Sequence, residues 1–254
     1  MKASAHGARR LTVAASLLGG AALWEIAGHL TTEAFWAPLT VTLKSLAELA
    51  QSGALLRQAS NSFQLYFAGL VFAIGVGAPA GMLLARVRWL RVALEPYITM
   101  LYATPMVALI PFILSILGFG FVPKVLVVFL FAVFPVLYNT VEGARSIKPE
   151  LVEVAYSFRS DEWQLWRDVM IPYTLPFMMT GVRQAIARGL VGMVVAEFFL
   201  SPSGLGQLIM MGSQNFDTAS MLAAILIIVV LGVVLMDVGR YLENRYAAWR
   251  GYGR

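Results

Sequence analysis

Residues 150–172, ELVEVAYSFRSDEWQLWRDVMIP, place a polar and aromatic segment in an otherwise apolar chain. The 254-residue sequence is 59% hydrophobic and 13% charged, and its mean hydropathy is +0.75. A soluble domain of this length keeps about a quarter of its residues charged. The composition therefore predicts a membrane protein that forms one domain over residues 1–254, and the quoted segment is its polar exception.

Outside that segment, six stretches are apolar and long enough to cross a bilayer, which takes about 20 residues as a helix. We therefore expect an all-α membrane protein with about six transmembrane helices. A cleaved signal peptide is the alternative interpretation of the first stretch. The expected spans are residues 11–30, 62–85, 93–117, 122–140, 176–200 and 219–236.

Basic residues alternate between the two sides of these spans. One side carries Lys2, Arg9, Arg10, Arg86, Arg88, Arg91, Arg145, Lys148, Arg159, Arg167, Arg240, Arg245, Arg250 and Arg254. The other side carries only Lys44, Arg57 and Lys124. Because cytoplasmic loops are enriched in Lys and Arg, both termini and the 143–175 loop are predicted to be cytoplasmic. The net charge of +5 then reflects membrane topology rather than nucleic-acid binding.

The loop between the fourth and fifth spans is patterned as two short helices. Pro149 suits a first helical turn, and Ser160 is expected to cap a second helix that ends at Pro172. The break is expected near Arg159 and Ser160. Each helix has an apolar side, which must pack either under its own bundle or in a groove of another protein. A further amphipathic helix is expected in residues 38–53, PLTVTLKSLAELAQSG, either on the outer membrane surface or against the bundle.

Residues 153–176, EVAYSFRSDEWQLWRDVMIPYTLP, resemble the EAA loop of permease subunits in bacterial type I ATP-binding-cassette (ABC) importers. Glu153, Val154 and Ala155 fall on the Glu-Ala-Ala positions, and the exit Ile171-Pro172…Leu175-Pro176 also matches. Residues 143–151, 181–209 and 216–232 extend the resemblance to the branch that imports nitrate, alkanesulfonates, taurine or pyrimidine precursors. One departure is Arg159, which stands at the characteristic Gly of the family.

The resemblance implies a permease that forms half of a pathway in the bacterial inner membrane. The first loop helix would be a coupling helix, with Glu153, Val154, Ala155, Tyr156, Phe158, Arg159 and Ser160 as its contacts. Implied partners are two ATPase subunits that bind ATP and Mg, a second permease copy in a homodimer, and a periplasmic or lipid-anchored substrate-binding protein. The substrate would be a small solute, for example an anion such as nitrate, a sulfonate or taurine.

Two spans contain candidate pathway residues. Pro105 and Pro111 interrupt hydrogen bonding in the third span near Tyr102 and Thr104. The fifth span carries Arg183, Gln184 and Arg188, and a lone Arg inside a membrane must face water or pair. Two side chains have a simpler alternative, in which Arg183 snorkels to the inner surface and Glu197 to the outer surface. We expect Gly77 and Gly81 to serve helix packing.

The residue inventory excludes several function classes. There is no Cys, and the two His residues are far apart, so no His or Cys metal site and no Cys or His catalytic site is expected. No phosphate-binding loop sequence is present. The chain is therefore expected to be a transport subunit that is not an enzyme and binds no cofactor or metal. The alternative function is a dimeric secondary transporter driven by an ion gradient.

Overall fold

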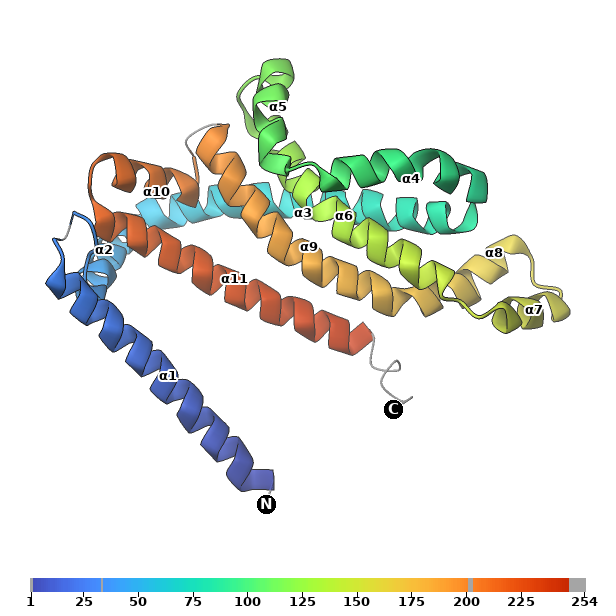
Figure 1. Cartoon of the computed structure of the whole chain (residues 1–254), viewed down its shortest axis with the longest axis horizontal. Helices are drawn as coiled ribbons and strands as arrows, with labels where there is room; N and C mark the ends of the chain where they lie inside the picture. Colours follow the sequence, from blue (N-terminus) through green and yellow to red (C-terminus); the bar gives the residue numbers. More distant parts are fainter. Residues whose placement is uncertain (1, 33, 201–202, 247–254) are drawn as a thin grey trace. The chain divides into compact units, whose positions relative to one another are not determined.

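The computed structural model describes residues 2–32, 34–200 and 203–246, with side chains from residue 11 onward. The described residues form helices and connecting turns without strands (Figure 1). They divide into two compact units, one of residues up to 61 and 203–229, the other of residues 62–200 and 230–246. Arg250 and Arg254, which belong to the predicted basic flank, lie outside the described residues.

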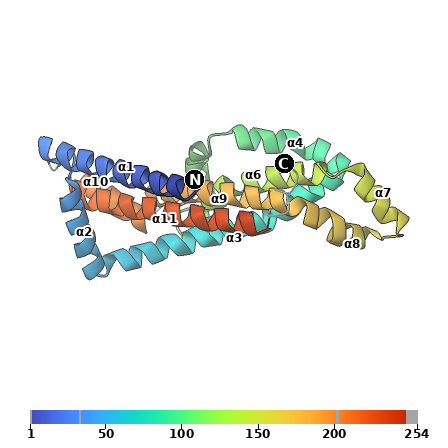
Figure 2. The ribbon, with the colours of Figure 1, turned by 90° about the horizontal axis from the view of Figure 1, so that it is seen from below.

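In the first unit, helix α1 (Lys2–Leu30) is followed by α2 (Leu39–Gln51), which meets it at a steep angle (Figure 2). Glu25 of α1 holds the start of α2, because its carboxylate accepts hydrogen bonds from the backbone N–H and hydroxyl of Thr40 at 3.0 and 2.7 Å. Helix α10 (Leu205–Gln214) joins this unit through a 3.1 Å bond between the amides of Gln58 and Gln207. The predicted helix of residues 38–53 is confirmed.

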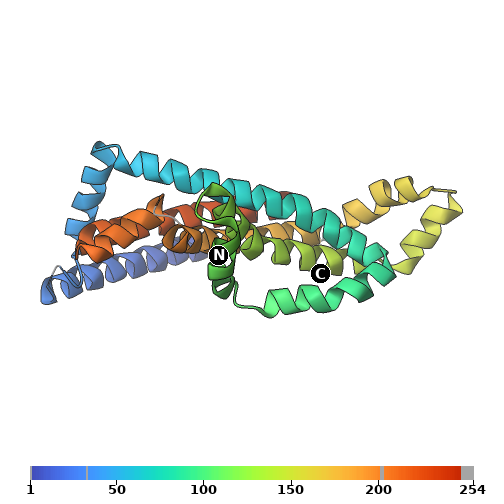
Figure 3. The same ribbon diagram turned by 90° about the horizontal axis from the view of Figure 1, so that it is seen from above.

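Small residues set the core of the second unit, where α3 (Ala54–Arg86) packs on α6 (Phe121–Arg145), as seen in Figure 3. A Cβ at Gly69 would lie 2.5 Å from Val128, and one at Gly81 would lie 2.7 Å from Thr140. Gly77 approaches the backbone of Val133 in the same way. This spacing of small residues lets two membrane helices come close, so the predicted packing role of Gly77 and Gly81 is confirmed.

Helix α9 (Ile171–Phe199) packs beside α6 and completes that core. Gly181 faces the carbonyl oxygen of Pro135, and Gly192 faces Phe131. The last helix, α11 (Thr218–Tyr246), contributes Leu235 and Met236 to the same core. The second unit is therefore built on three long helices, with the end of a fourth against them.

The third predicted span is not continuous. It divides into α4 (Arg88–Ala103), the 3₁₀ turn η1 (Met106–Leu109) and α5 (Ile110–Leu117), and the two arms are bent by 95° (Figure 1). Thr104 has an extended ψ of 130°, because a residue before proline is kept out of the helical region. Pro111 lies in the first turn of α5, where it is tolerated. Pro105 alone therefore breaks the span.

Among the described residues, four helices are long and apolar enough to cross a membrane: Leu11–Leu30 of α1, α3, α6 and α11. The bent pair of α4 and α5 raises that number to five if it forms one span. The remaining predicted span, 176–200, lies in α9 up to Phe199, but Arg183, Arg188 and Glu197 make it too polar to join this set. Length and composition therefore support four or five of the six expected spans.

Candidate functional site

The polar loop contains the two predicted helices, α7 (Pro149–Ser157) and α8 (Glu162–Gln164), which project beyond the end of α6 (Figure 1). A small core fixes them to the second unit: Ala155 and Leu165 are buried with Met82, Ala144 and Met170. Leu165 is fully buried. Since these side chains come from α3, α6, α7 and the turn between α8 and α9, the loop is attached to the bundle rather than free in solution.

A left-handed residue separates the two loop helices. Arg159 has a φ of 57°, and its N–H donates to the carbonyl of Tyr156 at 2.8 Å while the N–H of Ser160 donates to Ala155 at 3.1 Å. These bonds form a Schellman motif, which most often has Gly at the left-handed position. Arg159 therefore adopts the turn that a Gly would adopt at lower cost.

The second loop helix starts one residue later than expected. Asp161, not Ser160, caps it, because the Asp161 carboxylate accepts from the N–H of Gln164 at 2.7 Å and the Gln164 side chain accepts from the N–H of Asp161 at 2.9 Å. This reciprocal capping box favours Asp161. Pro172 also does not end the helix. A π-helical turn, η2 (Leu165–Met170), leads into α9, and Pro172 lies in the first turn of α9.

An ion pair ties α8 to the end of α3. The Arg86 guanidinium donates to Glu162 at 2.8 Å, and the Tyr156 hydroxyl donates to the same carboxylate at 2.8 Å. The hydrogen bond from Tyr156, followed by that from Arg86, lowers the pKa of Glu162 below its ordinary value. The contact joins residues from α3, α7 and α8, so it orients both loop helices against the bundle.

The loop also has apolar side chains that are exposed. Val154 is 52% exposed and Phe158 is 81% exposed. Trp163 at the start of α8 is 71% exposed, and Glu153 lies beside them on α7 and is also exposed. Of the other predicted coupling residues, Ala155 is buried and Ser160 is half-buried. The loop thus combines side chains that pack on its own bundle with exposed ones, and we refer to the exposed set of Glu153, Val154, Phe158 and Trp163 as its open side.

The broken span brings three predicted pathway residues together. Tyr102, Thr104 and Arg188 line a pocket of about 310 Å³ beside η1, together with Phe131 and Phe134. The Arg188 guanidinium lies over the Tyr102 ring, 5.4 Å from its centre. Within the part of the chain that the structure describes, Arg188 forms no ion pair with a carboxylate. A cation, an aromatic ring and an interrupted helix therefore meet in one pocket.

The other two predicted pathway residues lie elsewhere on α9. The Nε atom of Arg183 lies 2.6 Å from Glu243 Oε2 of α11, and the same carboxylate accepts a hydrogen bond from Thr180 at 2.7 Å. Arg183 therefore pairs rather than reaching open water. Gln184 accepts a weak bond from the Asn139 side chain at 3.4 Å. These contacts join helices, and neither residue lines the pocket that contains Arg188.

A buried polar cluster was missed by the sequence analysis. Glu197 is 1% exposed, so the expectation that it snorkels to the outer surface is wrong. The Ser62 hydroxyl donates to its carboxylate at 2.6 Å, and Lys124, which is 4% exposed, interacts with it electrostatically. A lysine and a glutamate near the same end of neighbouring spans were the available signal, but their positions in sequence did not indicate contact.

No three His, Cys, Asp or Glu residues in the described ranges come together in a way that would hold a metal ion. The polar groups of the second unit instead join helices to one another, line the pocket that contains Arg188, and orient the α7–α8 loop. This arrangement suits binding and mechanical coupling.

Comparison with known proteins agrees with this arrangement. Residues 77–248 match the family model described as binding-protein-dependent transport system inner membrane component. The chain is 32% identical over 232 residues to SsuC of Bacillus subtilis, which its name assigns to aliphatic sulfonates transport, covering 90% of this chain and 84% of that protein. It is 31% identical to the glycine betaine/proline betaine transport system permease protein ProW of Escherichia coli, over 80% of this chain and 58% of ProW.

The riboflavin transport system permease protein RibX of Chloroflexus aurantiacus is 38% identical over 165 residues, which are 65% of this chain and 62% of RibX. The chain thus spans less than two thirds of the length of RibX and ProW. These relatives are named for different substrates, so they do not resolve the branch.

The fold is similar to that of a chain in inward-facing structures of the MetNI methionine ABC transporter, with a TM-score of 0.64, 19% identity and coverage of 76% of this chain and 95% of that chain. The family match rules out the alternative of an ion-driven secondary transporter. The chain belongs to the binding-protein-dependent transport system inner membrane component family, and it is a multi-pass inner-membrane permease component of an ABC importer rather than an enzyme.

Proposed function

We propose that this chain is half of a translocation pathway for a small organic or inorganic anion of the sulfonate type, moved by ATPase subunits that dock on the α7–α8 loop. Arg188 is the observation that supports the anionic substrate. A cation inside a membrane helix is costly unless it pairs or faces water, and Arg188 lies over an aromatic ring while no carboxylate among the described residues forms an ion pair with it.

The chemistry of the pocket that contains Arg188 favours some of the substrates for which the relatives are named over others. A sulfonate offers a full negative charge and three acceptor oxygens to a guanidinium. Riboflavin is uncharged at its ring system. Betaine is a zwitterion of zero net charge, in which repulsion of the quaternary ammonium by Arg188 opposes the attraction of the carboxylate. The similarity to SsuC agrees with the choice of a sulfonate. Thr104 and Tyr102 would supply further polar contacts at the helix break.

The open side of the loop supports the coupling role. Val154, Phe158 and Trp163 form an exposed apolar surface, while the other side of the same loop is fixed to α3 and α6 by Leu165 and Arg86. A partner that grips the open side would therefore move the bundle as well. We assign the coupling contacts to Glu153, Val154, Tyr156 and Phe158, with Arg159 and Ser160 shaping the turn and Ala155 anchoring it.

The proposal also includes the membrane topology of the chain and the assembly of the importer. With α9 as the fifth crossing and the bent α4–α5 pair as the third, the chain crosses the membrane six times with both termini and the loop in the cytoplasm. Two copies would enclose the pathway, since symmetric homodimers are the commonest assembly. Two ATPase subunits and a periplasmic or lipid-anchored binding protein complete the importer, and ATP and Mg would be held on the ATPase chains.

The coupling role is tested by reversing one charge on the open side. Glu153→Lys is expected to abolish ATP-driven uptake in membrane vesicles while the permease remains inserted at normal level. Glu142→Lys is the matched control, because Glu142 is an exposed carboxylate on α6 outside the loop helices. We expect the control to retain uptake. Normal uptake by Glu153→Lys, or equal loss in both variants, would contradict the assignment.

A further inference from the structure

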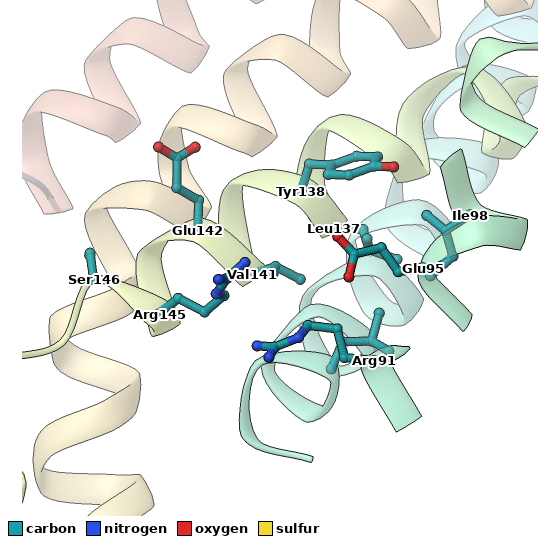
Figure 4. A pocket seen from close by; sticks show the side chains of 10 residues that line it. Arg91, Glu95, Ile98, Leu137, Tyr138, Val141, Glu142, Arg145 and Ser146 are labelled. Carbon is teal, nitrogen blue, oxygen red and sulfur yellow. The ribbon is translucent and has the colours of Figure 1, made fainter. Parts of the chain in front are cut away.

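A second pocket lies between α4 and the end of α6, away from the Arg188 pocket (Figure 4). Its volume is about 390 Å³. Leu84, Ile98, Leu137 and Val141 give it an apolar wall, and charged side chains enter from both helices. The combination of an apolar wall and charged groups is typical of a site for an amphiphilic ligand.

The charges in this pocket are not paired with one another. Arg91 of α4 and Arg145 of α6 point toward each other, and Glu95 enters the same space, while Glu142 points away (Figure 4). The described residues provide no hydrogen bond or ion pair to the side chains of Arg91, Arg145 or Glu95. Two facing guanidinium groups repel each other, and an anion between them would remove that repulsion. Guanidinium forks match phosphate oxygens particularly well.

The surroundings of the pocket fit the surface of a membrane. Helix α4 buries none of its side chains, and Trp89 at its start is 73% exposed. Trp is enriched at the level of lipid headgroups, and Arg86 and Arg88 lie just before it in the chain. Basic pockets between membrane helices on the cytoplasmic side are known to accept lipid headgroups.

We propose that this pocket binds the headgroup of phosphatidylethanolamine from the inner leaflet. The phosphate would lie between Arg91 and Arg145, and the ammonium would donate to Glu95. The first carbons of the acyl chains would lie against Ile98 and Leu137. The assignment to the inner leaflet rests on the proposed orientation, whereas the headgroup chemistry rests on the pocket alone.

Glu95 decides between lipid classes. Phosphatidylglycerol and cardiolipin have no cation to offer it and would bring their negative charge close to a carboxylate. Phosphatidylcholine has a cation without N–H donors, so it could not form the hydrogen bond. Phosphatidylethanolamine supplies both the phosphate and the donor. The pocket is therefore expected to prefer this lipid to the other three.

Native mass spectrometry of the full-length chain in detergent, titrated with each lipid, tests the proposal. We expect phosphatidylethanolamine to bind at lower concentration than phosphatidylglycerol or phosphatidylcholine. The double variant Arg91→Gln with Arg145→Gln should weaken its binding at least tenfold. Glu95→Gln should reverse the preference in favour of phosphatidylglycerol. Arg88→Gln is the matched control, since Arg88 is a nearby exposed arginine outside this pocket, and it should leave binding unchanged.

Competition with glycerophosphoethanolamine, which lacks acyl chains, and with taurine separates a lipid from a free solute. Weak displacement by the former at millimolar concentration would agree with headgroup recognition. Binding of either compound without measurable binding of the phospholipid would overturn the lipid assignment. Equal binding of all phospholipids, unchanged in the double arginine variant, would also overturn it, because acyl chains alone would then account for binding.

Discussion

Arg183 and Arg188 lie on the same helix, yet their surroundings differ. Arg183 is held by Glu243 at 2.6 Å, and Thr180 bonds to the same carboxylate. Arg188 lies over the ring of Tyr102 in a pocket at the broken span. The first arginine is neutralised by its own chain and joins α9 to α11. The second forms no ion pair with a described carboxylate, and we propose that its charge contacts the substrate. Pairing, rather than membrane depth or residue type, separates a structural charge from a candidate functional one.

Glu197, a charged residue that is 1% exposed, should show the largest structural effect. Glu197→Ala removes the carboxylate that faces Lys124 and Ser62 in the interior. Removing one partner of a buried pair typically costs about 3–5 kcal/mol, so we expect the free energy of unfolding to fall by about 3 kcal/mol or more. Thermal unfolding of the purified chain in detergent measures this change. The double variant Lys124→Met with Glu197→Leu should recover most of the loss, and failure to recover would argue against pairing.

The Arg183 contact should show a smaller effect, because its side chains are 35% and 19% exposed. Glu243→Ala leaves the guanidinium without its carboxylate, which we expect to lower the free energy of unfolding by about 2 kcal/mol. Asp237→Ala on the same helix is the control, since its pair with Arg240 is 3.5 Å long and mostly exposed; such pairs contribute about 0–1 kcal/mol. Equal decreases in melting temperature for Glu243→Ala and Asp237→Ala would contradict the expected difference between the two ion pairs.

Replacing Arg159 tests whether its left-handed backbone conformation lowers the stability of the fold. Its φ of 57° is unfavourable for a residue with a Cβ by roughly 1–2 kcal/mol. Arg159→Gly is therefore expected to raise the free energy of unfolding by about 1 kcal/mol, measured by thermal unfolding of the assembled complex. Phe216→Gly, at the other exposed non-Gly residue with positive φ, should give a similar gain. An unchanged melting temperature for Arg159→Gly would show that the turn is not strained.

The exposed pair of Glu162 with Arg86 should have the smallest effect, and its effect should depend on pH. Because the folded-state pKa of Glu162 is lowered, the stabilisation is complete above the ordinary glutamate pKa and is lost as pH falls through the folded-state value. The melting-temperature difference between the wild type and Glu162→Gln should therefore be present at neutral pH and disappear in acid. A difference that persists in acid would point to packing of the side chain instead.

Local patterns predicted much of the fold because they depend on near neighbours in the chain. The two loop helices, the break near Arg159 and the packing at Gly77 and Gly81 follow from capping residues, proline, glycine and apolar spacing. The cap at Asp161 was missed by one residue, because Ser160 and Asp161 are both good caps and only Asp161 has Gln164 at the matching position.

Contacts between distant residues could not be predicted in this way. Nothing near Glu197 in the sequence indicates that Ser62, 135 residues away, donates to it. Similarly, Pro105 indicated a weakened helix, but the 95° bend depends on how α5 packs. The pairing of Arg183 with Glu243 and the open position of Arg188 also depend on which helices meet. The candidate residues were therefore predictable, whereas the distinction between them required the structure.

Uptake of a sulfonate by the complete importer in proteoliposomes, compared between Arg188→Gln and Glu243→Gln, tests the central claim most directly. The account predicts that Arg188→Gln lowers ATP-driven uptake at least tenfold with a melting temperature close to that of the wild type, and that Arg188→Lys keeps part of the activity. Glu243→Gln should lower the melting temperature and largely preserve uptake per folded complex. Full uptake by Arg188→Gln would contradict the account.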